Sequence, residues 1–352
     1  MVPQSPPASP QPRTWDVNYR DLEPQLERQL ADAPNSLEIM DELARVYRTL
    51  AKYEKAADLY RHALELRETA AGRQSIDLVP TLENIARISQ LLRKPAEAEI
   101  MYARAIGIRE ATQGPDHADV AGEYNALARL FFVQKKFVDA EPLYTRALQI
   151  LEKNYGPTDL KLCSTLDNLA SDYREQTKFD QAELLLRRSL IVRDMAIGPI
   201  HPEVANALDS LASLYYSQKR FVDAHPLYER SLQIWLTLLG PDHSVVATSL
   251  DNLAVVYAML KNYPQAEKLY QQALKIRDGE DASSLHNLAL VEEGLKKDTE
   301  ADGLYKRMVG MPLKDPGPPL LEYAELLRKM HRPVEAAKME LRAKTPPDKT
   351  KQ

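Results

Sequence analysis

The amino-acid sequence predicts an all-α protein, folded as a right-handed α-solenoid of about eight helix-turn-helix repeats. Two observations predict this fold class. Gly-Pro dipeptides recur at a fixed spacing, and a string rich in Leu and Ala recurs at a constant offset from them. Apolar residues inside each repeat also follow the spacing of one face of an α-helix. A fixed period of several tens of residues indicates an array of stacked supersecondary units.

The repeat unit is marked by its junctions and by one small residue. The Gly-Pro junctions begin at Gly114, Gly156, Gly198 and Gly240, and the recurring string reads LENIA, LDNLA or LDSLA. The small residue that closes the string recurs at one constant interval and then twice at a shorter one: Ala44, Ala86, Ala128, Ala170, Ala212, Ala254, Ala289 and Ala324. These positions predict units near residues 30–71, 72–113, 114–155, 156–197, 198–239, 240–278, 279–312 and 313–343.

Each unit is expected to hold two amphipathic helices, called helix A and helix B. In the unit that begins at Gly156, two apolar stripes flank the polar break EQTK. They consist of Leu166, Leu169, Ala170 and Tyr173, followed by Phe179, Ala182, Leu185, Leu186 and Leu190. The Gly-Pro junction ends helix B. Because one hairpin cannot bury its stripe alone, the hairpins are expected to stack into a solenoid in which each contacts its neighbours.

The two ends of the chain differ from the repeats. Residues 1–18 are rich in Pro, Ser and Gln and are expected to be a disordered lead, and residues 344–352 a polar tail. Leu22, Leu26 and Leu30 predict a capping helix over residues 19–32, so that the superhelix spans residues 19–343. The start lacks the pattern of a secretory signal, which favours a cytoplasmic location. Whether a cleaved signal once preceded it is left open.

The repeat resembles the tetratricopeptide repeat, in the long form found in the kinesin light chain, over roughly residues 30–340. The resemblance rests on the Leu-Ala pair of helix A and on helix B strings such as FVDAEPLYTRAL. It also rests on an aromatic residue three positions after the Ala: Tyr47, Phe131, Tyr173, Tyr215 and Tyr257. No long heptad segment precedes the repeats in this sequence, which favours a relative of that class over the motor subunit. The resemblance implies that helices A line a concave, ligand-binding face.

Composition and motifs argue against several classes of function. Acids exceed bases by 51 to 46, which is unlike the basic face of a nucleic-acid binder. No apolar run is long enough to span a membrane. The sequence contains no P-loop, GxGxxG or GxSxG motif, and no pair of acids suited to catalysis. We therefore expect no enzymatic activity and no cofactor.

Histidine and cysteine give little sign of a metal site. His117, His201 and His243 recur at the junctions, where they either ligate a metal or help to begin helix A. The second interpretation is favoured, because zinc needs about four converging ligands and no second ligand type recurs with them. Cys163, the single cysteine, is expected to be a buried, inert thiol on helix A.

A row of arginines is the main candidate for a ligand site. Arg45, Arg87 and Arg129 each follow the small residue by one position, and Arg48 and Arg174 lie three positions further on in their units. Arginine forks bind carboxylates, so this row predicts capture of an acidic peptide or a C-terminal carboxylate. The alternative is a ladder neutralised by the chain's own acids, Asp41, Glu42 and Glu83.

Amide and aromatic side chains extend the candidate site along helices A. Asn84, Asn168, Asn252 and Asn287 share one position, where they either hold a peptide backbone or bond a neighbouring helix. Phe132 and Tyr216 are candidate aromatic anchors, with packing between units as the alternative. A further row is expected to make the later part of the groove acidic: Asp167, Asp209 and Asp251.

The sequence thus favours a non-catalytic scaffold that binds a peptide segment of a partner protein in its concave groove. Two alternatives stay open: a self-associating assembly protein, and a regulatory or sensor module whose effector lies elsewhere. A second arginine row on helices B is expected on a solvated or inter-unit face, with contact to an anionic partner as the alternative: Arg104, Arg146, Arg188 and Arg230.

Overall fold

In the computed structural model, residues 18–313 and 315–344 are described, and all of the regular structure among them is helical. This confirms the predicted all-α solenoid. Most of the predicted lead and nearly all of the predicted tail, at residues 1–17 and 345–352, lie outside the described residues. The chain forms two compact units, Met1–Gln176 (unit 1) and Thr177–Gln352 (unit 2), which are described separately.

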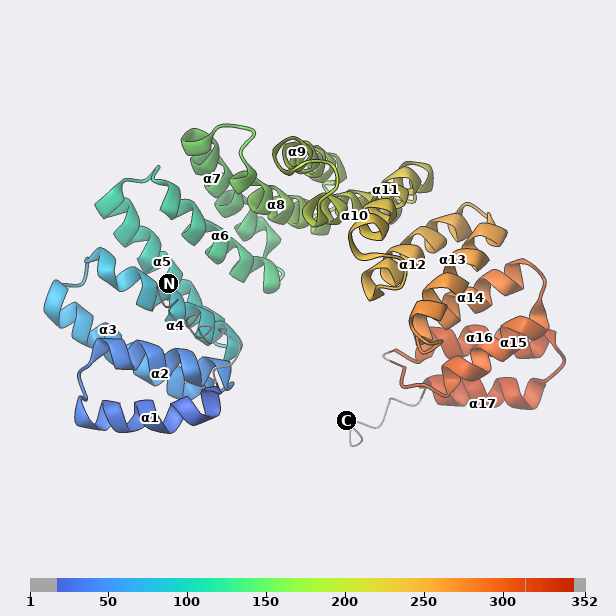
Figure 1. The fold of residues 1–352 in the computed structure, drawn as a ribbon, viewed down its shortest axis with the longest axis horizontal. Helices are drawn as coiled ribbons and strands as arrows, with labels where there is room; N and C mark the ends of the chain where they lie inside the picture. The colour runs from blue at the N-terminus through green and yellow to red at the C-terminus, as the bar shows by residue number, and fades with distance from the viewer. Residues whose placement is uncertain (1–17, 314, 345–352) are drawn as a thin grey trace, which may run out of the picture. The chain divides into compact units, whose positions relative to one another are not determined.

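Unit 1 consists of eight α-helices and two short 3-10 segments. Its α-helices are α1 (Tyr19–Asp32), α2 (Leu37–Thr49), α3 (Tyr53–Ala71), α4 (Val79–Leu91), α5 (Pro95–Gln113), α6 (Ala118–Val133), α7 (Phe137–Tyr155) and α8 (Cys163–Glu175). The 3-10 segments η1 (Ile76–Leu78) and η2 (Leu160–Leu162) lead into α4 and α8. Each helix packs on the next along the chain, and α6 also contacts α8 (Figure 1).

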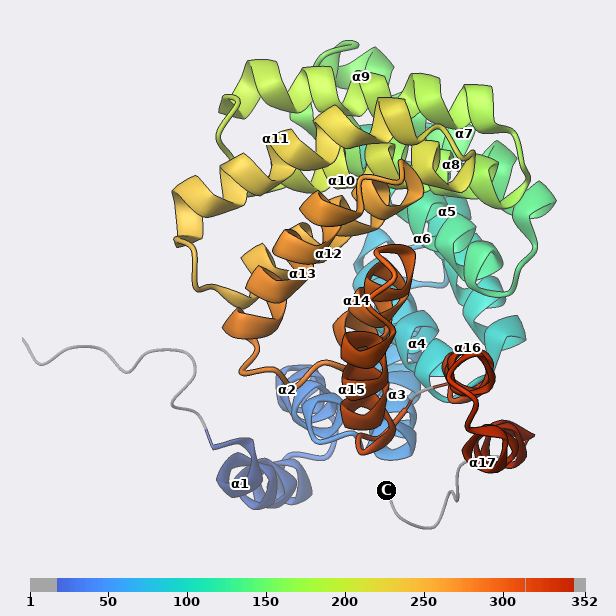
Figure 2. The same cartoon turned by 90° about the vertical axis from the view of Figure 1, so that its right-hand side faces the viewer.

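Unit 2 continues the same pattern. Its helices are α9 (Phe179–Ile197), α10 (Pro202–Ser217), α11 (Phe221–Leu239), α12 (Ser244–Met259), α13 (Tyr263–Ile276), α14 (Ala282–Gly294), α15 (Asp298–Val309), α16 (Gly317–Lys329) and α17 (Pro333–Lys344). Figure 2 shows the terminal pair, α16 and α17, nearly end-on. Contacts between neighbouring helices dominate, as expected for a solenoid.

The hydrophobic core in both unit 1 and unit 2 is built from the residues that define the helical repeat. All eight small residues of helix A, from Ala44 to Ala324, are buried. Large side chains fill the space between the helices, among them a recurring tyrosine of helix B: Tyr60, Tyr102, Tyr144, Tyr270 and Tyr305. In unit 1 one apolar cluster runs from Leu26 on α1 to Ile108 on α5. The alanines let the helix backbones approach, so a larger residue there would overpack the core.

The junction histidines begin helices A. His117, His201 and His243 are the N-cap residues of α6, α10 and α12, and in each the Nδ1 atom accepts a hydrogen bond from the backbone N–H two residues later. Each thereby satisfies one backbone donor that the first turn of a helix leaves unpaired. The structure thus supports the helix-starting interpretation of these residues.

Candidate functional site

The predicted arginines of unit 1 meet along helices A. A cavity of about 490 Å³ lies on the side formed by α2, α4, α6 and α8. Its lining includes four predicted site residues, which we call the arginine groove: Arg48, Arg87, Arg129 and Asn168. The remaining lining residues are Gln90, Leu91, Tyr102, Asn125 and Ala126. The groove therefore combines three guanidinium groups with several amide groups.

Two arginines of the groove keep their charge available. Within the described residues, Arg48 and Arg129 make no side-chain ion pair, and Arg87 pairs only with Glu83, one turn earlier on α4, at 2.8 Å. Arg87 and Arg129 are exposed, and Arg48 is half-buried. Of the three acids in the alternative interpretation, Asp41, Glu42 and Glu83, only Glu83 pairs with an arginine of the groove, which is Arg87.

The arginines on helices B behave differently. Arg104 bonds Glu68 at 2.5 Å, Arg146 bonds Asp116 at 2.9 Å, and Arg230 bonds Asp194 at 2.6 Å. Arg104 and Arg146 also donate to backbone carbonyls in the preceding junctions. Arg104 and Arg230 connect consecutive repeats, in agreement with the inter-unit placement expected for this row. Arg146 instead holds the junction that begins its own repeat.

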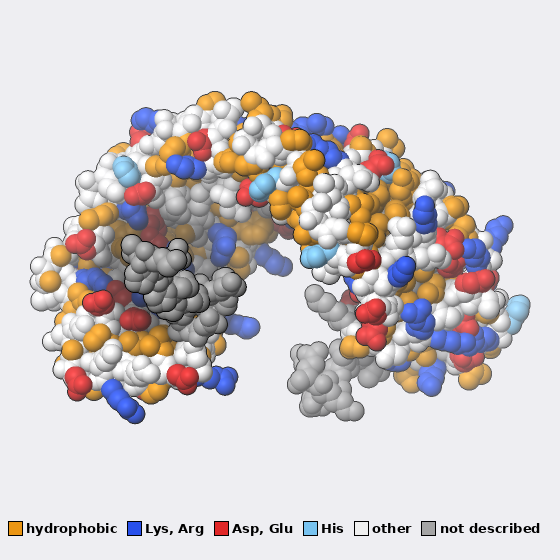
Figure 3. All heavy atoms as spheres, viewed as in Figure 1, with side chains coloured by type: hydrophobic (Ala, Val, Ile, Leu, Met, Phe, Trp, Pro, Cys, Tyr) orange, Lys and Arg blue, Asp and Glu red, His pale blue; other side chains and the backbone are white. Residues whose placement is uncertain are grey.

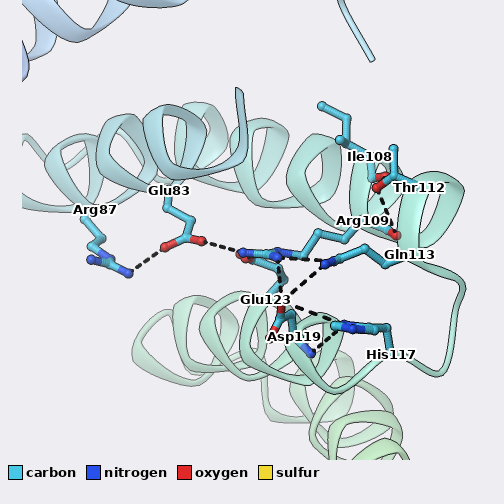
Figure 4. A network of polar contacts seen from close by, with 9 residues as sticks. All are labelled: Glu83, Arg87, Ile108, Arg109, Thr112, Gln113, His117, Asp119 and Glu123. Atoms are coloured by element: carbon cyan, nitrogen blue, oxygen red, sulfur yellow. Dashed lines mark hydrogen bonds and ion pairs between the residues drawn. The ribbon is translucent and has the colours of Figure 1, made fainter. Parts of the chain in front are cut away.

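A second hollow of about 440 Å³ adjoins the arginine groove and shares Arg87, Tyr102, Asn125 and Ala126 with it. Its floor is a polar network around Arg109 (Figure 4). The Arg109 guanidinium lies 2.9 Å from Glu123, 3.2 Å from Asp119 and 3.6 Å from Glu83. Burial and the nearby Glu83 raise the pKa of Glu123 to about 8. Arg109 thus holds three acids together beside the groove, and Glu83 links this network to Arg87.

Two further predicted residues, Tyr216 and Asn287, share a cavity in unit 2. The cavity measures about 500 Å³ and its lining is mostly apolar: Val255, Ala258, Met259, Tyr263, Tyr270, Leu290 and Val291, with Lys261. The Tyr216 ring packs against Phe221 of α11 at a centroid distance of 5.4 Å. Hydrophobic side chains reach the surface where α10 to α12 lie (Figure 3). This cavity suits an apolar side chain.

The other predicted site residues line neither cavity. Arg45 is exposed on α2, one turn before Arg48. Arg174 approaches Glu175 at 3.6 Å, and Asn84 and Asn252 are half-buried. The Phe132 ring contacts Phe137, the first residue of helix B in its own repeat, at 5.4 Å. Phe132 and Tyr216 thus each make a ring contact within their own repeat, and Tyr216 also lines a cavity with residues of the following repeats.

Two of the three acids expected to make the later part of the groove acidic, Asp209 and Asp251, are buried or paired. Asp251 is held by Arg277 and by the Ser284 hydroxyl, so its charge is matched within unit 2. Asp209 is largely buried, and burial raises its pKa to about 6. Asp167 also has an interaction of its own. At Asp251 the carboxylate therefore serves the packing of the repeat.

The sequence predictions did not single out a set of arginines that bond acids of helix A. Arg67, Arg109 and Arg277 occupy one position of helix B, and they reach the acids at one position of the preceding helix A: Asp41, Glu83 and Asp251. The recurrence of these arginines at the repeat period was visible in the sequence. Among the described residues no cluster of His, Cys, Asp and Glu is arranged to hold a metal ion, and no helix is long and apolar enough to cross a membrane.

The helix hairpins and the recurring strings define a class of repeat protein. Three family models, each described as tetratricopeptide repeat, match residues 119–194 and 203–279, residues 36–77 and 81–119, and residues 168–235. The chain belongs to the tetratricopeptide repeat family, and its repeats form a protein-interaction scaffold. Among curated proteins, none matches this sequence.

Solved structures include relatives of the kinesin light chain type. BtubC (BKLC) from P. vanneervenii is 25% identical with a TM-score of 0.54, over 72% of this chain and 91% of that one. A putative kinesin light chain from Podosopora anserina is 20% identical with a TM-score of 0.53, over 58% and 96%. A signal transduction ATPase with a tetratricopeptide repeat sensor, from Pyrococcus horikoshii, is 17% identical with a TM-score of 0.64, over 91% and 47%. The last two show the fold alone.

Proposed function

We propose that this protein binds a carboxylate-bearing peptide segment of a partner protein in the arginine groove of unit 1. The observation that carries the proposal is the contrast between two sets of arginines. Arg104, Arg146 and Arg230 on helices B are each bonded to an acid, whereas Arg48 and Arg129 are left without an ion pair among the described residues. Placing unpaired guanidinium groups around a cavity favours a negatively charged ligand.

The shape and the amide groups of the cavity support an extended peptide as the ligand. Asn125, Asn168 and Gln90 offer both donors and acceptors, which can bond a peptide backbone without reading its sequence. Asn125 already donates to the Thr165 hydroxyl at 2.7 Å, which fixes the orientation of its amide. Arginine supplies the charge, and the amides supply backbone contacts.

The apolar cavity of unit 2 is proposed as a separate subsite for an aromatic or aliphatic side chain of a partner. Tyr216 and Tyr263 provide ring surface, and Asn287 provides one amide at its edge. Aromatic pockets of this kind often hold the side chains that dominate binding energy. Replacing Tyr216 with Ala is expected to weaken a ligand that carries such a side chain while leaving a purely acidic peptide unaffected.

The proposal is tested by titration with a blocked peptide of alternating Asp and Glu residues and with its Asn/Gln counterpart. The wild type is expected to bind the acidic peptide, and raised salt to weaken that binding. Charge reversal of Arg48, Arg87 and Arg129 to Glu is expected to lower the affinity by about a hundredfold or more, because attraction becomes repulsion at three positions. Calorimetry or fluorescence anisotropy measures both.

The control is Arg73→Glu, which makes one such charge reversal at a side chain that is 84% exposed and lies outside the groove. It is expected to leave the affinity within about twofold of the wild type, because exposed charges act weakly at a distance in salt. Circular dichroism establishes that the triple variant stays helical, and Arg→Gln changes serve if it does not. Equal binding of the acidic and amide peptides by the wild type contradicts the proposal.

A further inference from the structure

The outward side of α9 in unit 2 carries an unusual apolar stripe. Leu184, Ile191 and Met195 expose 69%, 56% and 74% of their surface. Their spacing of seven and then four residues places all three on one side of the helix. A contiguous exposed apolar patch is typical of a surface that interacts with another molecule.

The other helices B show that the repeat does not need these side chains. The residues equivalent to Ile191 and Met195 are exposed in the other full-length repeats, yet they are polar or small. They are Glu65, Gly107, Gln149, Gln233 and Lys275 at the first position, and Thr69, Ala111, Lys153 and Thr237 at the second. At the position of Leu184, α5 also carries an exposed apolar residue, Ile100, so the pair Ile191 and Met195 is what distinguishes α9. Folding of the hairpin does not explain this pair.

The stripe has the spacing of a seam between two helices. Leu184, Arg188, Ile191 and Met195 follow intervals of four, three and four residues, the spacing by which helices pair along their length. Arg188 is half-buried, and the aliphatic stem of an arginine can pack in such a seam while its guanidinium stays at the edge. Three of these four side chains, Leu184, Ile191 and Met195, are apolar. Pairing of two copies of this face would bury these side chains against each other.

The charges beside the stripe select an antiparallel arrangement of two identical helices. Arg187 and Asp194 lie seven residues apart on the same flank. When two copies pair antiparallel, a flank meets the same flank of the other copy, so Arg187 faces Asp194 of the second copy twice. In a parallel pair Arg187 would face the opposite flank, where Val192 is buried.

Both charged side chains retain exposed surface for this contact. Arg187 bonds Glu183 at 2.9 Å and the Tyr215 hydroxyl at 2.5 Å, and Asp194 bonds Arg230. Their side chains nevertheless remain 55% and 29% exposed. Each is held in place by a neighbour within unit 2, which lowers the entropy lost when a second partner binds.

We propose that two copies of this chain associate through α9, in antiparallel orientation. Leu184 of one copy packs against Met195 of the other, and Ile191 packs against the Arg188 stem of the other. The charge complementarity of the flank is what favours a second copy over an unrelated helix. The proposal does not rest on the arginine groove, which lies in unit 1.

The first test is the oligomeric state of the full chain, measured by sedimentation velocity over a range of concentrations. The wild type is expected to form a dimer. The double change Ile191→Gln and Met195→Thr introduces the residues that α11 carries at the same positions, so folding is expected to persist. Because four apolar side chains leave the interface, the dissociation constant is expected to rise by about a hundredfold.

The control is Val222→Gln, which removes an apolar side chain that is 75% exposed at the start of α11, outside the stripe. It is expected to leave the dimer intact. A wild type that sediments as a monomer at every concentration overturns the proposal. A dimer that survives the double change but dissociates in Val222→Gln places the interface elsewhere.

The second test establishes the orientation by disulfide cross-linking. Leu184→Cys and Met195→Cys are prepared separately, mixed and oxidised, with the buried Cys163 left in place. Antiparallel pairing predicts a cross-link in the mixture and none in either variant alone, because equal positions then lie about 16 Å apart along the helix. Cross-linking of each variant with itself contradicts the antiparallel arrangement.

Discussion

One pair of repeat positions, an acid on helix A and an arginine on helix B, differs between repeats in a way that affects stability. In several repeats an acid on helix A meets an arginine at a fixed position of the following helix B, as in Asp41 with Arg67 at 2.5 Å. In the repeat of α10 and α11 the acid is kept as Asp209, but the arginine is replaced by Trp235. Asp209 Oδ1 is buried and has no hydrogen-bond partner within the described residues. A buried carboxylate without a cation costs free energy when it is ionised.

Replacing Asp209 with Asn is expected to stabilise the protein near neutral pH. Burial raises the pKa of Asp209 from the ordinary 3.8 to about 6, and Ser231 and Trp235 offset only part of this effect. A raised folded-state pKa gives stability that is complete below about pH 4 and is lost as the pH rises through 6. At about pH 7.5 the change should therefore raise the free energy of unfolding by about 2–3 kcal/mol.

Urea denaturation near neutral pH and near pH 4 measures this effect, which should vanish at the acidic pH. The control is Asp41→Asn, in the same position of an earlier repeat. Because it removes the partner of Arg67, it is expected to destabilise the protein by about 1–2 kcal/mol at neutral pH. Equal destabilisation by both changes would show that Asp209 is stabilised by a charge.

The turns between helices follow two different rules. The turn from helix A to helix B places a non-glycine residue in the left-handed region, as at Lys135 with φ of 61° and Lys219 with φ of 60°. The residue that follows each of these donates its N–H to a carbonyl five positions earlier, which completes the helix end. The turn after helix B instead uses glycine, as at Gly156, with φ of 84° and ψ of 170°. That backbone conformation is open mainly to glycine.

Gly156→Ala is therefore expected to destabilise unit 1 by about 1–2 kcal/mol, although nothing lies within 4 Å of the added methyl group. The matched control is Gly107→Ala in the middle of α5, where the added methyl group also meets nothing within 4 Å. It should stabilise the helix by up to about 1 kcal/mol. Thermal or urea unfolding compares the two, and loss of stability in both would show that space, and not backbone conformation, limits these positions.

At the scale of the whole molecule, the sequence predicted the fold well because the repeat is local. Each alanine, leucine and tyrosine of the repeat contacts its own hairpin or the next one, so a constant period specifies the packing directly. The N-cap role of His201 could likewise be read from its place before Pro202.

The candidate site was predicted less completely. Arg45, Arg87 and Arg129 are equivalent in sequence, yet the cavity takes Arg48 in place of Arg45. Successive repeats of a solenoid are rotated slightly, so equivalent side chains do not converge on one point. The ion pairs of Arg109 and Arg277 depend on how side chains of different helices are placed, which periodicity alone does not give. Charge counting for that reason did not anticipate that Asp251 is paired and that Asp209 is largely buried.

The central claim is that the arginine groove captures a partner protein, and a pull-down from a lysate of the source organism tests it most directly. The wild type, the Arg48/Arg87/Arg129→Glu variant and the Arg73→Glu control are compared at low and high salt. The account predicts a partner that is retained by the wild type and the control, released by salt and absent from the triple variant. A partner that the triple variant retains equally well, in either salt, would contradict it.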